Sequence, residues 1–549
     1  MDENIIFNEK KKLTNDIEKL NDEFFNQRIE TKLSLRKKAM NDILYNRRIL
    51  QNNSVNIDNK KVYKLKYDIS NIKLIIDKSE VKFNINFDQN ESEKILSYAS
   101  KYLKSENIDD IKNGIILTKM FINKNLNNNL SDYINFLFIY ELFHIIDRIK
   151  DNKKIIFNIL DIIISYSYIN NDLNLATILL SPNSYKTFEL CFNLQDFEIF
   201  HAIICVLINI IKDNQIGTCN LIRSNFLQNN IFHFFMNESI ISQKNIEDKN
   251  NIIYHIIQDG ITLFCHLMIV SIDNLDLVTK EEIKSSKKNV IKILLSYLNS
   301  NCFESYYKCI YSIAIIVEKD CELFEELEKY NFIENILLNK KFFDEKKTLF
   351  YLNKIIGNYL AFKKKVSDKI LSEVVEFESN YLDICKDSSE RKNIFWTLSN
   401  LIMLDKNSYE KIFEVKQLIP SIVDSLKNSH TFSEIKEIIY FFGILLSLGN
   451  LKHFFIIEEN HLLKLILDII KNVCENKVEI LHMCFQIIEI YLEFGEITSK
   501  YHEGKNIIKK KFEKLGGKEI LEKYINYQCG NFDNEIINIY KKFYCSLKD

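Results

Sequence analysis

Proline and glycine, the residues that most often interrupt regular structure, are scarce in this chain. Its 549 residues include only two prolines and 11 glycines, which argues against an architecture built on many tight turns. Apolar residues instead recur at every third or fourth position, the period of an amphipathic helix. A chain of this length also exceeds a single globular core. We therefore expect an all-α protein made of several domains or of stacked repeats.

The sequence also lacks the short motifs that mark common enzyme and metal sites. It has no glycine-rich phosphate loop, no Gly-x-Ser-x-Gly elbow, no His-Glu-x-x-His and no dinucleotide-binding fingerprint. The 12 cysteines include no CxxC pair and form no cysteine–histidine cluster at zinc spacing. The ten histidines, among them His144, His201, His255 and His266, are scattered, and we interpret them as packing residues. We expect a binding protein rather than an enzyme, with no cofactor and no bound metal.

Signals for secretion or membrane insertion are missing as well. The N-terminus is charged and has no apolar core of a signal peptide. The apolar stretch from Ile261 to Ile272 is too short to span a bilayer. Cysteines such as Cys205 and Cys265 lie in apolar helical settings, as buried reduced thiols do. We expect a protein of the cytoplasm and nucleus whose partners are neither membranes nor nucleic acids.

Charge is nearly balanced over the whole chain but is unevenly distributed. Residues 28–50 carry seven basic and two acidic side chains, a net charge of +5. Because the whole chain carries a net charge of −2, the remaining residues carry −7. A basic segment on an acidic body indicates an acidic partner for the segment and basic ligands for the body. The apolar residues Leu35, Ile43 and Leu44 are suited to seat this segment on a partner as a helix. The alternative is a solvated charged helix or tail.

The spacing of residues within this basic segment matches a known pattern: an arginine, then a Leu-Arg-Lys step, then an ending similar to Leu-x-Arg-Arg. The residues that carry the pattern are Arg28, Leu35, Arg36, Lys37, Leu44, Arg47 and Arg48. In this respect the segment resembles the importin-β-binding arm of importin-α, the adaptor family of nuclear import. The resemblance implies importin-β as a partner. Asn46 stands where the family has a cargo-mimicking lysine, so we expect little autoinhibition by the arm.

A second resemblance rests on the stretch Phe395–Leu401, which holds the only tryptophan. Trp396 and Asn400 lie four residues apart and therefore on the same face of a helix. An indole face packs a long side chain and attracts its cationic end, while an amide donates to and accepts from a peptide backbone. The pair resembles the third helix of an importin-α armadillo repeat. The alternative is that Trp396 is a core aromatic and Asn400 an ordinary polar helix residue.

Similar features recur along the chain at the spacing of armadillo repeats. Asn358 and Asn400 are separated by one period of the roughly 40–47 residues that are typical of such arrays. The family's groove binds basic nuclear-localisation peptides through asparagines, aromatic residues and acidic residues. By this resemblance, the peptide-binding residues here are Asn209, Asp213, Asn358, Trp396, Asn400, Glu437 and Tyr440.

Other positions depart from the family pattern. Cys205 stands where a tryptophan precedes Asn209, and Ile444 replaces an asparagine in the second half. Lys363–Lys365 occupy places where the family is acidic, and we expect them to repel a basic peptide. The first half therefore lacks aromatic slots, and any basic peptide is expected to bind near Trp396.

These observations divide the chain into three parts. Residues 1–50 form the basic arm, residues 51–95 a linker or a small β-insert, and residues 96–549 a solenoid of about ten repeats. Three short runs between residues 62 and 87 alternate with the period of strands. Two polar stretches, Asn125–Asn129 and Ser242–Asn251, are expected to be loops between helices.

The expected fold is all-α, an armadillo-repeat superhelical solenoid with an N-terminal basic helical arm. The first functional hypothesis is an importin-α-like nuclear import adaptor that binds basic nuclear-localisation peptides in its groove and importin-β through its arm. The alternative is a divergent armadillo scaffold that no longer binds such peptides. A third hypothesis, a regulatory subunit of an enzyme, accounts for the repeats but not for residues 28–50.

Overall fold

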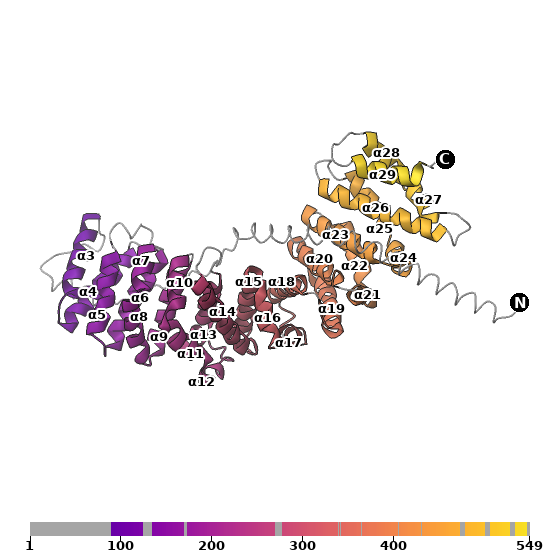
Figure 1. The fold of residues 1–549 in the computed structure, drawn as a ribbon. Helices are drawn as coiled ribbons and strands as arrows, with labels where there is room; N and C mark the ends of the chain where they lie inside the picture. The colour runs from indigo at the N-terminus through magenta and orange to yellow at the C-terminus, as the bar shows by residue number, and fades with distance from the viewer. Residues whose placement is uncertain are drawn as a thin grey trace. The chain divides into compact units, whose positions relative to one another are not determined.

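The computed structural model describes most of the chain beyond residue 88, and the regular structure of these residues is helical throughout (Figure 1). The described residues are 89–124, 134, 136–169, 173–212, 214–269, 277–338, 340, 342–363, 365–404, 406–429, 431–472, 478–499, 506–526 and 533–545. No strand occurs among them. The prediction of an all-α solenoid is therefore confirmed.

The chain divides into two compact units, with the boundary between Leu327 and Glu328. We call the described parts before and after this boundary the N unit and the C unit. The helices up to the boundary are α3 (Gln89–Leu103), α4 (Ile108–Lys124), α5 (Phe136–Arg148), α6 (Lys153–Ile169), α7 (Leu173–Leu179), α8 (Pro182–Asn193), α9 (Phe197–Ile211), α10 (Gln215–Arg223), the π-helix η2 (Leu227–Phe232), α11 (His233–Met236), α12 (Glu238–Ile241), α13 (Ile252–Met268), α14 (Leu277–Leu298), α15 (Phe303–Lys319), the 3-10 helix η3 (Cys321–Leu323) and α16 (Phe324–Glu328).

In the C unit from α21 onward, two shorter helices precede a longer one in each group of three. Its helices are α17 (Phe332–Leu338), α18 (Lys346–Phe362), α19 (Asp368–Ile384), α20 (Ser388–Ile402), α21 (Lys406–Glu414), α22 (Leu418–Asn428), α23 (Phe432–Leu448), α24 (Leu451–Glu459), α25 (Leu462–Asn472), α26 (Val478–Ser499), α27 (Ile507–Lys514), α28 (Gly517–Asn526) and α29 (Asp533–Tyr544). From α21 to α26 the lengths run 9, 11 and 17, then 9, 11 and 22 residues. Such three-helix groups are typical of armadillo units.

One long helix from each group packs against its counterpart in the next group. These ladder helices, as we call them, are α4, α6, α9, α13 and α15 in the N unit and α18, α20, α23 and α26 in the C unit. In the C unit, each step from the start of one ladder helix to the start of the next falls within the predicted period of roughly 40–47 residues. In the N unit the steps from α9 to α13 and from α13 to α15 exceed this period, so this unit is less regular.

Two ladder helices, α9 and α13, form the centre of the N unit. α9 buries 12 of its 15 residues and α13 buries 14 of its 17. A helix that is apolar on every side is stable only where other helices cover it all round. Both begin at a capping residue: Asp196 accepts hydrogen bonds from the amides of Glu198 and Ile199, and Asn251 accepts one from Ile253.

Several boundary predictions can be compared with the structure. The first described helix, α3, begins at Gln89, inside the segment 51–95 that was assigned to a linker or β-insert. The polar stretch 242–251 connects α12 to α13 without a helix, as predicted. Eight of the ten described cysteines are buried, as their apolar settings indicated. The arm, the three alternating runs and Asn125–Asn129 lie outside the described residues.

Membrane insertion finds no support among the described helices. None of them combines the length and the apolar character that crossing a bilayer requires.

Candidate functional site

Trp396 lies on α20, which packs between α18 and α23 (Figure 1). α20 begins after Asp387, whose side chain accepts hydrogen bonds from the amides of Ser389 and Glu390. The indole of Trp396 is half-buried and rests on Gly357 of α18. A Cβ atom at position 357 would lie only 2.2 Å from the indole Cζ3. The glycine therefore makes room for the tryptophan.

Asn400, one turn after Trp396, is not on the solvated face where it was expected. Its side chain is buried, with 2% of its surface exposed. The amide nitrogen Nδ2 donates a hydrogen bond to the carbonyl oxygen of Gly357 over 3.1 Å. The amide therefore joins α20 to α18, and in this arrangement it does not reach a peptide in solution. In this structure Asn400 is a buried polar residue in the packed interface between two ladder helices.

Asn209 makes the corresponding bond in the N unit. Its Nδ2 donates to the carbonyl oxygen of Ile164 over 3.1 Å and to Oγ of Ser167 over 3.2 Å. The acceptor carbonyl lies 45 residues earlier in the chain, compared with 43 residues for Asn400. Because a buried amide requires hydrogen-bond partners, this contact gives a structural reason for asparagines to recur at the repeat spacing.

The other predicted peptide-binding residues of the C unit differ in exposure. Glu437 is buried, with 5% of its surface exposed, so its carboxylate does not face the solvent. Asn358 is half-buried, and its Nδ2 donates to the carbonyl oxygen of Lys354 in its own helix over 2.9 Å. Tyr440 is half-buried on α23, at the same position relative to the first residue of its helix as Trp396 on α20.

Lys363 does not present an uncompensated positive charge, in contrast to the expectation for Lys363–Lys365. Its Nζ contacts a carboxylate oxygen of Glu328 at 2.5 Å and lies 5.4 Å from the ring centre of Phe362. Lys365 is exposed, and Lys364 lies outside the described residues. The predicted repulsion of a basic peptide is therefore weakened at Lys363.

An ion pair at the start of the helix that carries Trp396 joins α20 to α23. Arg391 donates to both carboxylate oxygens of Glu434, over 2.6 and 3.3 Å, and Glu434 is fully buried. Ser388 and Ser429 each donate to the same carboxylate over 2.7 Å. Burial opposes ionisation of Glu434, but the hydrogen bonds from Arg391 and the two serines outweigh it and lower the pKa. This pair therefore fixes the helix that carries Trp396.

A cluster that the sequence did not predict lies between α9 and α13 of the N unit. His201 Nε2 is 2.7 Å from Asp259 Oδ2, and Cys205 Sγ is 3.6 Å from His201 Nε2 and 3.8 Å from Asp259 Oδ2. All three residues are buried. The sequence has no cysteine–histidine cluster at zinc spacing, but helix packing joins His201 and Cys205 to an aspartate of the next ladder helix. The only sign of this cluster in the local sequence was that His201 and Cys205 lie one turn apart on the same helix.

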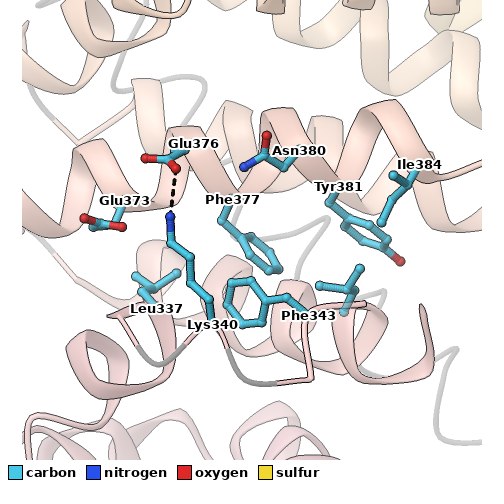
Figure 2. A pocket seen from close by; sticks show the side chains of 10 residues that line it. Leu337, Lys340, Phe343, Glu373, Glu376, Phe377, Asn380, Tyr381 and Ile384 are labelled. Carbon is cyan, nitrogen blue, oxygen red and sulfur yellow. Dashed lines mark hydrogen bonds and ion pairs between the residues drawn. The ribbon is translucent and has the colours of Figure 1, made fainter. Parts of the chain in front are cut away.

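Two of the hollows on the described surface include no predicted site residue. Figure 2 shows the smaller one, about 60 Å³, where Phe343 and Phe377 meet edge to face and Lys340 pairs with Glu376 at 2.8 Å. The larger hollow, about 560 Å³, lies between α8 and α10 and is lined by residues that include Tyr185 and Arg223. The smaller hollow is far too small for a peptide.

Part of the predicted site lies outside the described residues. This part consists of Asp213 and the predicted importin-β-binding residues Arg28, Leu35, Arg36, Lys37, Leu44, Arg47 and Arg48.

Comparison with known proteins supports the fold and no family. No protein-family model matches the chain, and no curated protein matches it. Among solved structures, the chain is similar to the crystal structure of an engineered protein from the Northeast Structural Genomics Consortium. The match has a TM-score of 0.59 at 11% sequence identity and covers 83% of this chain and 99% of that one. At this identity the likeness shows the helical fold alone.

Proposed function

We propose that this chain is a helical-repeat adaptor that holds an extended, basic segment of a partner protein along the ladder helices of its C unit. The observation that carries the proposal is the placement of Trp396 and Tyr440. Both are half-buried aromatic residues at the same position of the successive ladder helices α20 and α23. Aromatic rings one repeat apart offer a lysine- or arginine-bearing peptide two contact points.

The proposal extends to nuclear import through residues 28–50. The net charge of +5 and the spacing of its arginines and leucines support importin-β as a partner of this segment. An import adaptor needs both surfaces, one for cargo and one for importin-β. Deleting residues 1–50 should therefore abolish capture of purified importin-β and leave peptide binding intact. Full capture by the deleted protein would contradict the import role.

The single tryptophan makes the cargo proposal directly testable. A lysine-rich peptide titrated into the full-length protein should change the emission of Trp396, and a glutamate-rich peptide of equal length should not. In parallel, Trp396→Ala and Tyr440→Ala should each weaken binding of the labelled peptide, measured by anisotropy. Since an exposed cation–π contact contributes roughly 0.5–1 kcal/mol, each change should cost about two- to fivefold in affinity.

A matched control comes from another aromatic residue of the same unit. Tyr330 is 40% exposed and lies in the turn between α16 and α17, so it is not part of a ladder helix. Tyr330→Ala should leave peptide affinity unchanged. If the Trp396 and Tyr440 variants bind as tightly as the wild type, these aromatic residues are not the peptide site.

A second function is favoured by the burial of Asn400. Because its amide is bonded to Gly357, the C unit lacks a backbone clamp at this position. A scaffold that binds a folded partner, without recognising basic peptides, needs no such clamp. The two functions differ in the fluorescence titration: a scaffold should show no response of Trp396 to the lysine-rich peptide.

A further inference from the structure

Three kinds of metal-ligand atom meet between the ladder helices α9 and α13. They are an imidazole nitrogen of His201, the sulfur of Cys205 and a carboxylate oxygen of Asp259, and all lie within 4.8 Å of one another. This combination of nitrogen, sulfur and oxygen donors is one that Zn²⁺ accepts in proteins. We call these three residues the α9–α13 cluster.

The helices hold these side chains in place before any ligand binds. His201 and Cys205 lie four residues apart and so project from the same side of α9. Asp259 comes from α13, which packs along α9 as the next ladder helix. Asp259 is 1% exposed and Cys205 4% exposed. A site built on buried helices is more rigid than one built on loops.

The distances nearly match those of a four-coordinate zinc ion. Bonds of about 2.0–2.3 Å in a tetrahedron place neighbouring ligand atoms roughly 3.3–3.7 Å apart. Cys205 Sγ lies 3.6 Å from His201 Nε2 and 3.8 Å from Asp259 Oδ2, which is close to that range. The separation of 2.7 Å between His201 Nε2 and Asp259 Oδ2 is a hydrogen-bond distance and must lengthen by about 0.6 Å when an ion replaces the proton.

The charges of the cluster also fit a divalent ion. A thiolate and a carboxylate together carry two negative charges, which one divalent cation neutralises. Such compensation matters because an uncompensated charge in a buried position is strongly unfavourable. Binding then requires Cys205 to lose its thiol proton and His201 to present Nε2 without a proton. The affinity for the metal should therefore fall as the pH is lowered.

His255 lies beside the α9–α13 cluster but outside the group of three whose ligand atoms are within 4.8 Å of one another. It precedes Asp259 by one turn of α13, and its ring centre lies 5.8 Å from that of His201. Its Nε2 lies 2.7 Å from the carbonyl oxygen of Lys249, which can only accept a hydrogen bond. Nε2 therefore carries the proton, and in the neutral ring Nδ1 has the free lone pair.

We propose that the α9–α13 cluster binds one divalent ion of the zinc class through His201, Cys205 and Asp259. The site does not depend on the proposed peptide binding. It lies in the N unit, whereas Trp396 and Tyr440 lie in the C unit. An ion here would link two adjacent repeats.

Cobalt titration of the reduced full-length protein tests this proposal. Co²⁺ is the probe because its visible absorption reports tetrahedral coordination and its near-ultraviolet charge-transfer band reports a thiolate ligand. We expect both bands to saturate at one equivalent and to disappear when Zn²⁺ is added. A wild-type protein that shows neither band at one equivalent overturns the proposal, whatever any variant does.

Substitutions then assign the ligands. Cys205→Ser should remove the charge-transfer band, and His201→Ala and Asp259→Asn should each weaken Co²⁺ binding by at least tenfold. The matched control is Cys321→Ser, because Cys321 is a half-buried cysteine of the same unit in η3 and should leave both bands unchanged. His255→Ala should weaken Co²⁺ binding much less than His201→Ala, because His255 lies outside the group of three ligand atoms. A charge-transfer band that persists in folded Cys205→Ser places the metal elsewhere and contradicts the proposal.

Discussion

Two interfaces between ladder helices can be compared: α6 with α9 in the N unit, and α18 with α20 in the C unit. They share one hydrogen bond but differ in the residue that lies one turn before it. In both, an asparagine donates from Nδ2 over 3.1 Å to a backbone carbonyl of the preceding ladder helix. One turn before that asparagine, the N unit has Cys205 and the C unit has Trp396. The shared bond fixes successive repeats, and the residue one turn earlier differs chemically: a thiol beside His201 and Asp259, or an indole at the surface.

The largest expected effect concerns the ion pair that positions Trp396. Arg391→Met should leave the fully buried carboxylate of Glu434 without its cation and destabilise the C unit by about 3–5 kcal/mol. Urea unfolding followed by Trp396 emission measures this loss. Arg391→Lys is the control, since it keeps the charge but not the two-pronged contact, and should lose less. Equal stability of the methionine variant would show that the pair does not hold α20 to α23.

A second prediction tests whether the two asparagine contacts are equivalent. Asn400→Asp places a carboxylate against the Gly357 carbonyl in a site that is 2% exposed, and should cost roughly 3 kcal/mol. Asn209→Asp should cost about 1 kcal/mol, because Asn209 is half-buried and the new charge keeps part of its hydration. Trp396 emission reports the first variant, and circular dichroism reports both. Equal losses would mean that exposure does not distinguish the two interfaces.

A third prediction concerns the glycines that receive aromatic rings in each unit. Gly357→Ala should push against the indole of Trp396, and Gly260→Ala against Phe235, whose ring would lie 2.0 Å from the new Cβ. Overpacking of this kind costs typically about 1–3 kcal/mol. Gly443→Ala is the control, because a Cβ there meets only Ile487, at 3.9 Å. That variant should gain up to about 1 kcal/mol from helix propensity, and a comparable loss there would contradict the packing explanation.

The smallest effect is a pH dependence confined to the C unit. The pKa of Glu434 is lower in the folded protein than in the unfolded chain, so the unfolded state binds more protons in acid. The stability contributed by this group is fully present above its unfolded pKa of about 4.3 and is lost as the pH falls through its folded pKa. Stability curves of the wild type and Glu434→Gln should therefore run parallel above this acidic range and converge within it. Curves that stay parallel there would show that Glu434 does not titrate as described.

The fold was predictable from the sequence because it depends on local patterns. Scarce proline and glycine, a helical apolar period and asparagines one repeat period apart were sufficient to predict an all-α repeat array. The residues at which helices begin were harder to predict from the sequence. For example, α3 starts at Gln89, although the residues before it alternate between apolar and polar as strands do. Boundaries depend on packing partners that a local pattern does not contain.

The site was less predictable, since exposure depends on contacts between repeats. The sequence placed Trp396 and Asn400 on one helix face but could not show that Gly357 receives the first and bonds to the second. Likewise, His201 and Cys205 were visible as residues one turn apart, whereas Asp259 joins them only through the packing of α13 on α9. Side chains of different repeats meet in space without any short spacing in the chain.

The π-helix η2 has a consequence for insertions and deletions in this gene. Its wider turn adds a residue just before α11, which carries the fully buried Phe235 onto Gly260, next to Asp259. Deleting one residue between 227 and 232 would restore α-helical winding and rotate Phe235 by about 100° away from α13. A single lost codon, far from any ligand in the sequence, would then disturb the position of Asp259. Reading-frame-preserving deletions should therefore be selected against in η2.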